Sequence, residues 1–362
     1  MQKKLIALAV ASLVSAPVFA QSTVSVYGVV DQAVDSGNYG AGNVTRLTGS
    51  GYTTERLGFK GSEDMGNGMK ANFMLELGMK GPNGNLDNAQ AAPAQLFQRV
   101  STVGLSGNWG SVNFGRQYTP LFSIQANNDI FRVAGIGSNY ALTNIGETRA
   151  NNSIRYDSAN MNGFSAAVMY ALGDTGTAAV FQESTITPKD QGRHTGLNLQ
   201  YGNGPLALGL GWSNQKQMGV VAPASPVALK STIFAGSYDF KVVKINAGWQ
   251  TANNDSNPRT VDGRVWTLGA TVPVFGNDSV KFHYNSFKNK LVGNADAKLL
   301  ALGYVHPMSK RTTLYGTYAK MYNDNGSVAT LFGAPALGAN PGNVLSPGFD
   351  PSSVQIGLSH NF

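Results

Sequence analysis

Apolar and polar residues alternate with a period of two along almost the whole chain. The last segment places Val354, Ile356 and Leu358 on one face and small or polar residues on the other. Residues 23–31 repeat this pattern near the start. Successive side chains of a β-strand point to opposite faces, so the pattern predicts strands with one apolar face. Comparable segments begin near residues 55, 69, 97, 111, 151, 164, 194, 206, 229, 244, 263, 278, 297, 311 and 352, which with the first segment makes about sixteen strands.

The connections between these segments alternate between short and long. Short turns such as residues 64–68 and 276–277 contain Gly, Asn or Asp. Short turns on one side and long loops on the other are typical of a transmembrane β-barrel. A soluble β-sandwich would also alternate, but the uniformly apolar faces, the recurring long loops and a chain that ends inside a strand favour a closed barrel. The long stretches are residues 35–54, 81–96, 118–149, 172–193, 216–228, 253–262, 288–296 and 323–351.

Composition excludes several other classes of protein. The chain is 10% aromatic and only 13% charged, which argues against disorder. It has no Cys, so disulfide frameworks and Cys-based metal or redox sites are excluded. It also lacks the run of about 18 apolar residues that a membrane helix needs. The formal net charge of +7 is too small to indicate a nucleic-acid partner.

The first twenty residues are typical of a signal peptide. Lys3 and Lys4 precede an apolar stretch, and a small residue, Ala20, ends the segment. We expect cleavage between Ala20 and Gln21, so that residues 1–20 are removed and residues 21–362 form the barrel. Export places the mature protein beyond the inner membrane.

Five parts of the sequence resemble the general diffusion porins of Gram-negative outer membranes, most closely the β-proteobacterial branch. They are residues 26–31, 55–64, 115–120 and 152–156, and the terminal Phe362. The resemblance implies a sixteen-stranded antiparallel barrel and a homotrimer surrounded by outer-membrane lipid and lipopolysaccharide. It implies one water-filled pore per subunit, narrowed by an inward-folded third loop at about residues 118–150. It also makes Phe362 a C-terminal assembly signal.

Strand parity assigns basic residues to the lumen. Leu57 and Phe59 are apolar and are expected to face lipid, which turns Arg56 and Lys60 inward. An Arg on the lipid face at the bilayer midplane would cost about 2–4 kcal/mol. The same argument places Val100 on the lipid face and sends Arg99 and Ser101 inward, and it places Arg149, Asn151, Ser153 and Arg155 inward. Arg116 breaks strict parity, which predicts a trimer contact, a position at the loop base or a β-bulge.

The charges predict a preference for anions. The resemblance places Arg56, Arg99 and Arg149 on one wall of the constriction, with Lys60 and Arg155 as further basic candidates. The acids of the opposing third loop are Asp129 and Glu147. Opposed charges would set up a transverse field, and the excess of cations favours anions. The alternative is that these side chains form ordinary lumenal salt bridges with little effect on selectivity.

The sequence disfavours functions other than a diffusion pore, and each of them predicts a different feature. The four His residues lack a nucleophile or acid in the patterns that catalysis needs, and no metal or cofactor motif occurs, so we expect no enzyme. The barrel could instead act as a surface adhesin or receptor, with a narrow lumen. A substrate-specific channel for sugars would carry an aromatic track along the lumen, and parity predicts none. Passive diffusion of ions and small hydrophilic solutes is therefore the preferred function.

Overall fold

The computed structural model describes residues 23–40, 42–87, 95–143, 148–173, 190–217, 226–334 and 346–362. The expected signal peptide with its cleavage site at Ala20 and Gln21 lies outside the described residues, and so does Glu147. No helix in the described part of the chain is long and apolar enough to cross a membrane.

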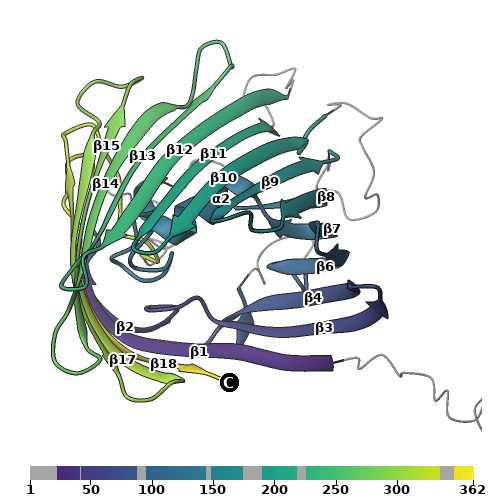
Figure 1. The fold of residues 1–362 in the computed structure, drawn as a ribbon. Helices are drawn as coiled ribbons and strands as arrows, with labels where there is room; N and C mark the ends of the chain where they lie inside the picture. The colour runs from purple at the N-terminus through teal and green to yellow at the C-terminus, as the bar shows by residue number, and fades with distance from the viewer. Residues whose placement is uncertain are drawn as a thin grey trace, which may run out of the picture.

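Sixteen antiparallel strands of the described chain close into a barrel, which confirms the fold predicted from the alternation (Figure 1). Each strand pairs with its sequence neighbours in the wall, and β1 also pairs with β18. Two more strands, β2 (Asn43–Gly49) and β5 (Asn85–Leu86), lie in long connections. The wall consists of β1 (Thr23–Asn38), β3 (Arg56–Gly66), β4 (Met69–Lys80), β6 (Val100–Gly107), β7 (Gly110–Tyr118), β8 (Arg149–Ser158), β9 (Phe164–Ala171), β10 (His194–Asn203), β11 (Leu206–Gln217), β12 (Val227–Asp239), β13 (Lys244–Asn254), β14 (Asp262–Pro273), β15 (Ser279–Asn289), β16 (Ala297–Pro307), β17 (Thr312–Asn323) and β18 (Ser352–Asn361).

The last residue completes the closure of the barrel. The β1–β18 register runs from Val29 opposite Asn361 to Asn38 opposite Ser352. Beyond it, the backbone N–H of Phe362 donates to the Gly28 carbonyl over 3.1 Å, and the Gly28 N–H donates to the Phe362 carbonyl over 3.1 Å. A side chain at Gly28 would collide with the Phe362 ring, since an added Cβ would lie 2.4 Å from it. Closure leaves no unpaired strand edge in this part of the wall.

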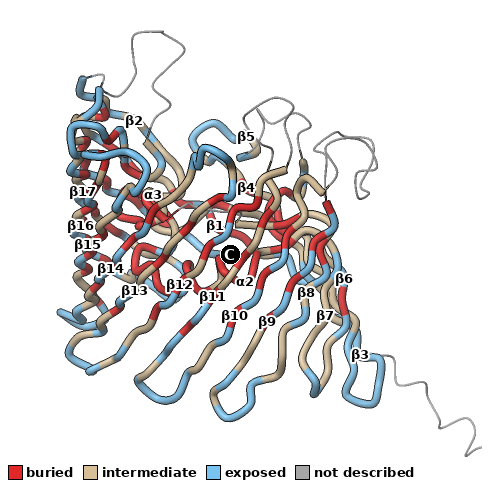
Figure 2. The backbone as a smooth tube through the Cα atoms, turned by 90° about the horizontal axis from the view of Figure 1, so that it is seen from above, coloured by how far each residue is buried: buried red, intermediate tan, exposed pale blue. Residues whose placement is uncertain are grey.

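The two faces of each strand differ in burial as the alternation predicts. On β18, Val354, Ile356 and Leu358 are 45%, 59% and 47% exposed, whereas Gln355 and Ser359 are buried. Figure 2 shows this alternation along the strands, with the short turns gathered at one end. The apolar residues therefore form the outer surface of the barrel, where hydrocarbon replaces water as their solvent.

The described part of the third loop, residues 119–143 and 148, folds into the barrel, and helix α2 (Pro120–Asn128) lies inside the wall (Figure 1). Thr119 caps this helix, because its hydroxyl accepts from the Phe122 N–H. Leu121 and Ile124 pack against Ile233 of β12. Room for the helix comes from glycines in β11: a Cβ at Gly211 would lie 3.1 Å from the Leu121 backbone. Small residues on the lumen face thus decide where the loop rests.

The second half of the third loop is held by apolar packing. It includes helix α3 (Tyr140–Thr143). Ile130, Phe131, Ile136 and Leu142 join a buried cluster with side chains of β14, β16 and β17. Full burial of one such side chain contributes about 1.5–3 kcal/mol. The loop is therefore a fixed part of the barrel interior. The wall residues of the cluster are Val265, Ala297, Leu299, Ala301, Ala319 and Met321.

A buried carboxylate fixes the first loop beside the third. Asp31 of β1 is 0% exposed and accepts from the backbone N–H groups of Gly51, Tyr52 and Thr53 over 3.1, 3.0 and 2.7 Å. The Tyr315 hydroxyl of β17 donates to the same carboxylate over 2.6 Å. This arrangement turns the segment at residues 50–54 into the lumen.

The first loop in turn contacts the second and third loops. Glu55 accepts from the Asp31 N–H over 3.1 Å and from the Gly81 N–H over 2.7 Å. Burial raises the pKa of the Glu55 carboxyl above its ordinary value. The Gly135 N–H of the third loop donates to the Ser50 carbonyl over 2.9 Å. The three loops therefore hold one another in place.

Candidate functional site

A water-accessible cavity of about 660 Å³ lies between the third loop and the wall formed by β3 to β8. Within the described residues, five arginines line it and Asp87 is the only carboxylate that does. Arg132 comes from the third loop and the others come from the wall or its rim. The five are Arg56, Arg99, Arg132, Arg149 and Arg155.

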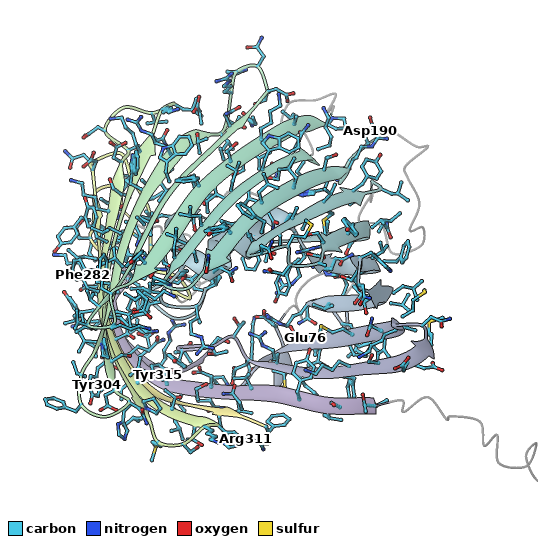
Figure 3. All side chains as sticks on the ribbon, viewed as in Figure 1. Glu76, Asp190, Phe282, Tyr304, Arg311 and Tyr315 are labelled. Atoms are coloured by element: carbon cyan, nitrogen blue, oxygen red, sulfur yellow. The ribbon has the colours of Figure 1, made fainter. Side chains whose placement is uncertain are left out.

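Glu76 of β4 holds two of these arginines together, and the sequence analysis did not single it out. Its Oε1 lies 2.6 Å from Arg99 Nε and 3.7 Å from Arg56 Nη1. The Tyr27 hydroxyl donates to Oε2 over 2.9 Å. Figure 3 labels Glu76 among the side chains of the barrel interior. Parity could have found it, because a carboxylate between Leu75 and Leu77 must face away from lipid.

Tyr118, at the end of β7, joins the second pair of arginines. Its hydroxyl accepts from Arg99 Nη2 over 2.7 Å and from Arg149 Nη2 over 2.8 Å. The Arg149 guanidinium also lies 4.3 Å from the centre of the Tyr118 ring. Cation–π contact and hydrogen bonding together fix the orientation of this side chain. Arg56, Arg99 and Arg149 are thus brought to one wall by Glu76 and Tyr118.

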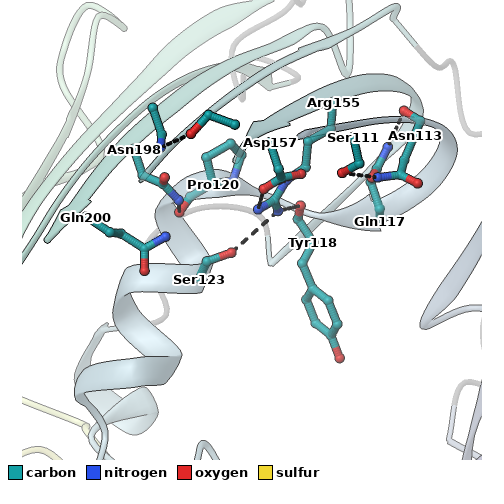
Figure 4. A network of polar contacts seen from close by, with 12 residues as sticks. Ser111, Asn113, Gln117, Tyr118, Pro120, Ser123, Arg155, Asp157, Asn198 and Gln200 are labelled. Atoms are coloured by element: carbon teal, nitrogen blue, oxygen red, sulfur yellow. Dashed lines mark hydrogen bonds and ion pairs between the residues drawn. The ribbon is translucent and has the colours of Figure 1, made fainter. Parts of the chain in front are cut away.

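The other two basic candidates are held neither by Glu76 nor by the Tyr118 hydroxyl. Arg155 is paired with Asp157 over 2.6 Å and donates to the Tyr118 carbonyl over 2.7 Å and to the Ser123 hydroxyl over 3.4 Å (Figure 4). Lys60 lines a second cavity of about 470 Å³, nearer the short turns, with its ammonium 5.1 Å from the Tyr27 ring centre. Arg155 and Tyr118 line both cavities.

Two parity assignments were wrong. Val100 is 6% exposed and lines the second cavity with Thr102, whereas Val103 is 61% exposed, so Ser101 shares the outer face with Val103. Arg99 is nevertheless inside, because it lies in a bend before β6 begins at Val100. Alternation applies only within a strand, so it could not be extended across the bend.

The exception at Arg116 coincides with a β-bulge, one of the three explanations expected for it. The β7–β8 register passes from Gly115 opposite Ser153 to Gln117 opposite Ala150, so β8 has one extra residue there. Gly115 has φ +120°. The Arg116 guanidinium donates to the Gln98 carbonyl and to the Asn151 side chain, both over 2.6 Å. These contacts satisfy a charge that alternation alone would have sent towards lipid.

Asp129 does not face the basic wall, which corrects the expected opposition of charges. It is 4% exposed and accepts from the N–H groups of Phe131 and Val133 over 2.9 and 3.1 Å and from the Ser138 hydroxyl over 2.5 Å. Its carboxylate also lies 3.8 Å from His283 Nδ1, a contact between residues far apart in the sequence that no local pattern could indicate. The Asp129 carboxylate therefore stabilises turns within the third loop.

Arg132 takes the place expected for an acid on the third loop. Its guanidinium lies 4.8 Å from the centre of the Tyr52 ring. Lys281 of β15 lies 5.2 Å from the same ring and donates to the Ile130 carbonyl over 2.7 Å. The constriction therefore carries positive charge on the loop side as well as on the wall. Such an arrangement attracts anions and repels cations.

Comparison with known proteins finds relatives of one family that match most or all of the chain. A family model described as Gram-negative porin matches residues 7–326. Outer membrane porin protein 32 of Delftia acidovorans is 36% identical over 378 residues, covering all of both chains. The solved anion-selective porin from Comamonas acidovorans is 32% identical, with a TM-score of 0.80 over 94% of this chain and all of that chain. OmpT of Vibrio cholerae, in its trimer form, shares the fold at 14% identity, with a TM-score of 0.65 over 94% and 99% of the two chains.

Proposed function

Since the chain belongs to the Gram-negative porin family, we propose that its pore prefers anions. The protein is a porin of the outer membrane, a channel through which ions and small hydrophilic solutes diffuse passively. The observation that carries the proposal is Arg132 opposite Arg56, Arg99 and Arg149, with Asp129 turned into its own loop. The anion-selective porin of Comamonas supports it as a relative.

We also propose the remaining features that the resemblance implies. Residues 1–20 act as the export signal, residues 21–362 form the pore domain, and residues 118–150 form the constriction loop. Three copies associate in the outer membrane, surrounded by lipid and lipopolysaccharide. The apolar outer surface of β1, β18 and their neighbours suits contact with a second copy of the chain and contact with lipid. The channel acts without catalysis.

In planar bilayers, the purified full-length mature protein is expected to conduct in steps grouped in threes. In a KCl gradient, the zero-current potential is expected to have the sign of chloride permeation, because arginines line both sides of the constriction. A silent protein would contradict the pore. A conducting protein with a potassium-like potential would contradict only the anion preference.

Deleting Phe362 is expected to reduce the yield of folded trimer several-fold. The deletion removes two backbone hydrogen bonds to Gly28 and the ring that covers it, each hydrogen bond contributing about 1 kcal/mol. The fraction that keeps the compact, fast-migrating form in unheated gel electrophoresis measures the effect. Phe275→Leu, a change in an exposed short turn, is the control. Equal yields from the two variants would reject the assembly role of Phe362.

A further inference from the structure

Four aromatic side chains form a continuous string along the arginine-lined cavity. Tyr118 stacks on Phe122 with ring centres 5.2 Å apart. Phe122 meets Tyr140 edge-on at 5.9 Å, and Tyr140 meets Phe332 edge-on at 5.3 Å. All four line the 660 Å³ cavity. We call Tyr118, Phe122, Tyr140 and Phe332 the aromatic string.

This string comes from loops and from the end of a strand, so parity along the wall could not reveal it. Phe122 lies on α2, Tyr140 begins α3, and Phe332 lies beyond β17. Three of the four rings keep part of their surface exposed, and Phe122 is 9% exposed. By contrast, Phe131 of the same loop is packed in the buried cluster. The aromatic string is therefore a wall of the cavity as well as a support for the loop.

The Tyr118 hydroxyl adds a hydrogen-bond donor next to the arginines. A phenolic oxygen has two acceptor positions and one proton. Arg99 and Arg149 occupy both acceptor positions. Among the described residues, no hydrogen bond is found in which Tyr118 Oη donates, so its proton remains for a ligand in the cavity. Two cations beside such a donor suit an oxyanion.

We propose that this cavity is a selective site for aryl carboxylates, which pass through the pore as preferred solutes. This inference rests on the anion preference proposed above. The carboxylate binds beside Tyr118, Arg99 and Arg149, where remaining guanidinium N–H groups and the hydroxyl proton donate to it. The ring of the solute lies against Tyr140 and Phe332, in offset or edge-on contact. A volume of about 660 Å³ is in the range of small-molecule sites.

The test compares two carboxylates of equal charge and similar size. Chloride conductance of the full trimer in planar bilayers is measured while benzoate or cyclohexanecarboxylate is added. Benzoate is expected to halve the chloride conductance at a concentration about threefold lower than cyclohexanecarboxylate does, because only the benzoate ring makes aromatic contacts. Unspecific partitioning into apolar surface would give the opposite order, since the saturated ring is the more apolar. Equal or reversed potency in a conducting, anion-preferring protein would overturn the proposal and leave the proposed function intact.

Variants of the aromatic string separate ring recognition from charge. Phe332→Leu, and Phe332→Leu combined with Tyr140→Leu, are expected to abolish the threefold preference for benzoate while chloride selectivity stays. Phe332→Leu changes a single loop side chain that is only partly buried, so it provides a reading even if the double variant folds poorly. Phe164→Leu, on the outer face and 59% exposed, is the matched control and should keep the preference. A preference for benzoate that survives in both string variants would reject the aromatic site. If the unaltered protein does not prefer chloride at all, the anion-preferring pore itself is rejected.

Discussion

Replacing Arg56, Arg132 and Arg149 together with glutamine is expected to reverse the ion preference of the pore. Within the described residues, five arginines line the main cavity, and the carboxylates nearby are Asp87, Glu76 and Asp157. The triple variant leaves two arginines against these three carboxylates. Arg99 and Arg155 are the two that remain, and each is paired with an acid.

The size of this effect follows from Coulomb's law. One unit charge about 8 Å from an ion contributes roughly 0.5 kcal/mol even in bulk water. Three charges therefore contribute roughly 1.5 kcal/mol for each ion, about tenfold, and the contribution is favourable for chloride and unfavourable for potassium. The zero-current potential in a KCl gradient should change sign.

A matched triple variant tests whether position or net charge matters. Lys241, Lys244 and Lys310 are exposed near the short turns, away from the constriction. Their replacement by glutamine removes the same net charge and should leave the potential nearly unchanged. If both triple variants shift the potential equally, the constriction arginines do not set selectivity.

Asp31→Ala is expected to lower the free energy of unfolding by about 4 kcal/mol. The change removes the acceptor of one buried and two partly buried N–H groups and of the buried Tyr315 hydroxyl, and unsatisfied buried donors cost about 1–3 kcal/mol each. Loss of the buried charge offsets part of this cost. Asp31→Asn should recover at most half of the loss, because its amide would direct N–H groups at N–H groups.

Urea unfolding of the protein in detergent measures this change. Asp64→Ala is the control, since Asp64 is exposed and accepts from the Gly66 N–H over 2.8 Å in a short turn. It should change the free energy of unfolding by less than about 1 kcal/mol. Released from Asp31, residues 50–54 would also lose their hold on the third loop through Ser50 and Gly135. Unfolding of Asp31→Ala at the same urea concentration as the unaltered protein would contradict the role of this carboxylate.

The strands were predictable because each residue of a barrel wall meets one of two solvents. The alternation in residues 352–362 gave β18 with the correct face outward, and the lengths of the connections separated the two ends of the barrel. The same rule failed at Val100 and Ser101. There a bend at Arg99 resets the phase, and nothing in the apolar pattern marks a bend.

The charged residues also divide into those within regular strands, whose positions could be predicted, and those in loops, whose positions could not. Arg56 and Lys60 could be placed inside the barrel because they lie within a regular strand. Glu76 could have been placed by the same rule. Asp129 could not, because a loop has no period and its acid turned to the nearest backbone N–H groups. The aromatic string was missed for this reason too, since most of its members lie in loops.

The sequence by itself determined the sixteen strands, the outer faces of those that run without a bend or bulge, the end at which the long loops gather and the collection of basic residues in the lumen. These properties follow from the contrast between hydrocarbon and water at every second residue. Only the tertiary structure decided which charges meet at the constriction, namely Glu76 and Tyr118 between the arginines and Arg132 opposite them. The position of the third loop depends on packing and hydrogen bonds with strands more than a hundred residues away, such as Lys281 with Ile130, and no local pattern records those contacts.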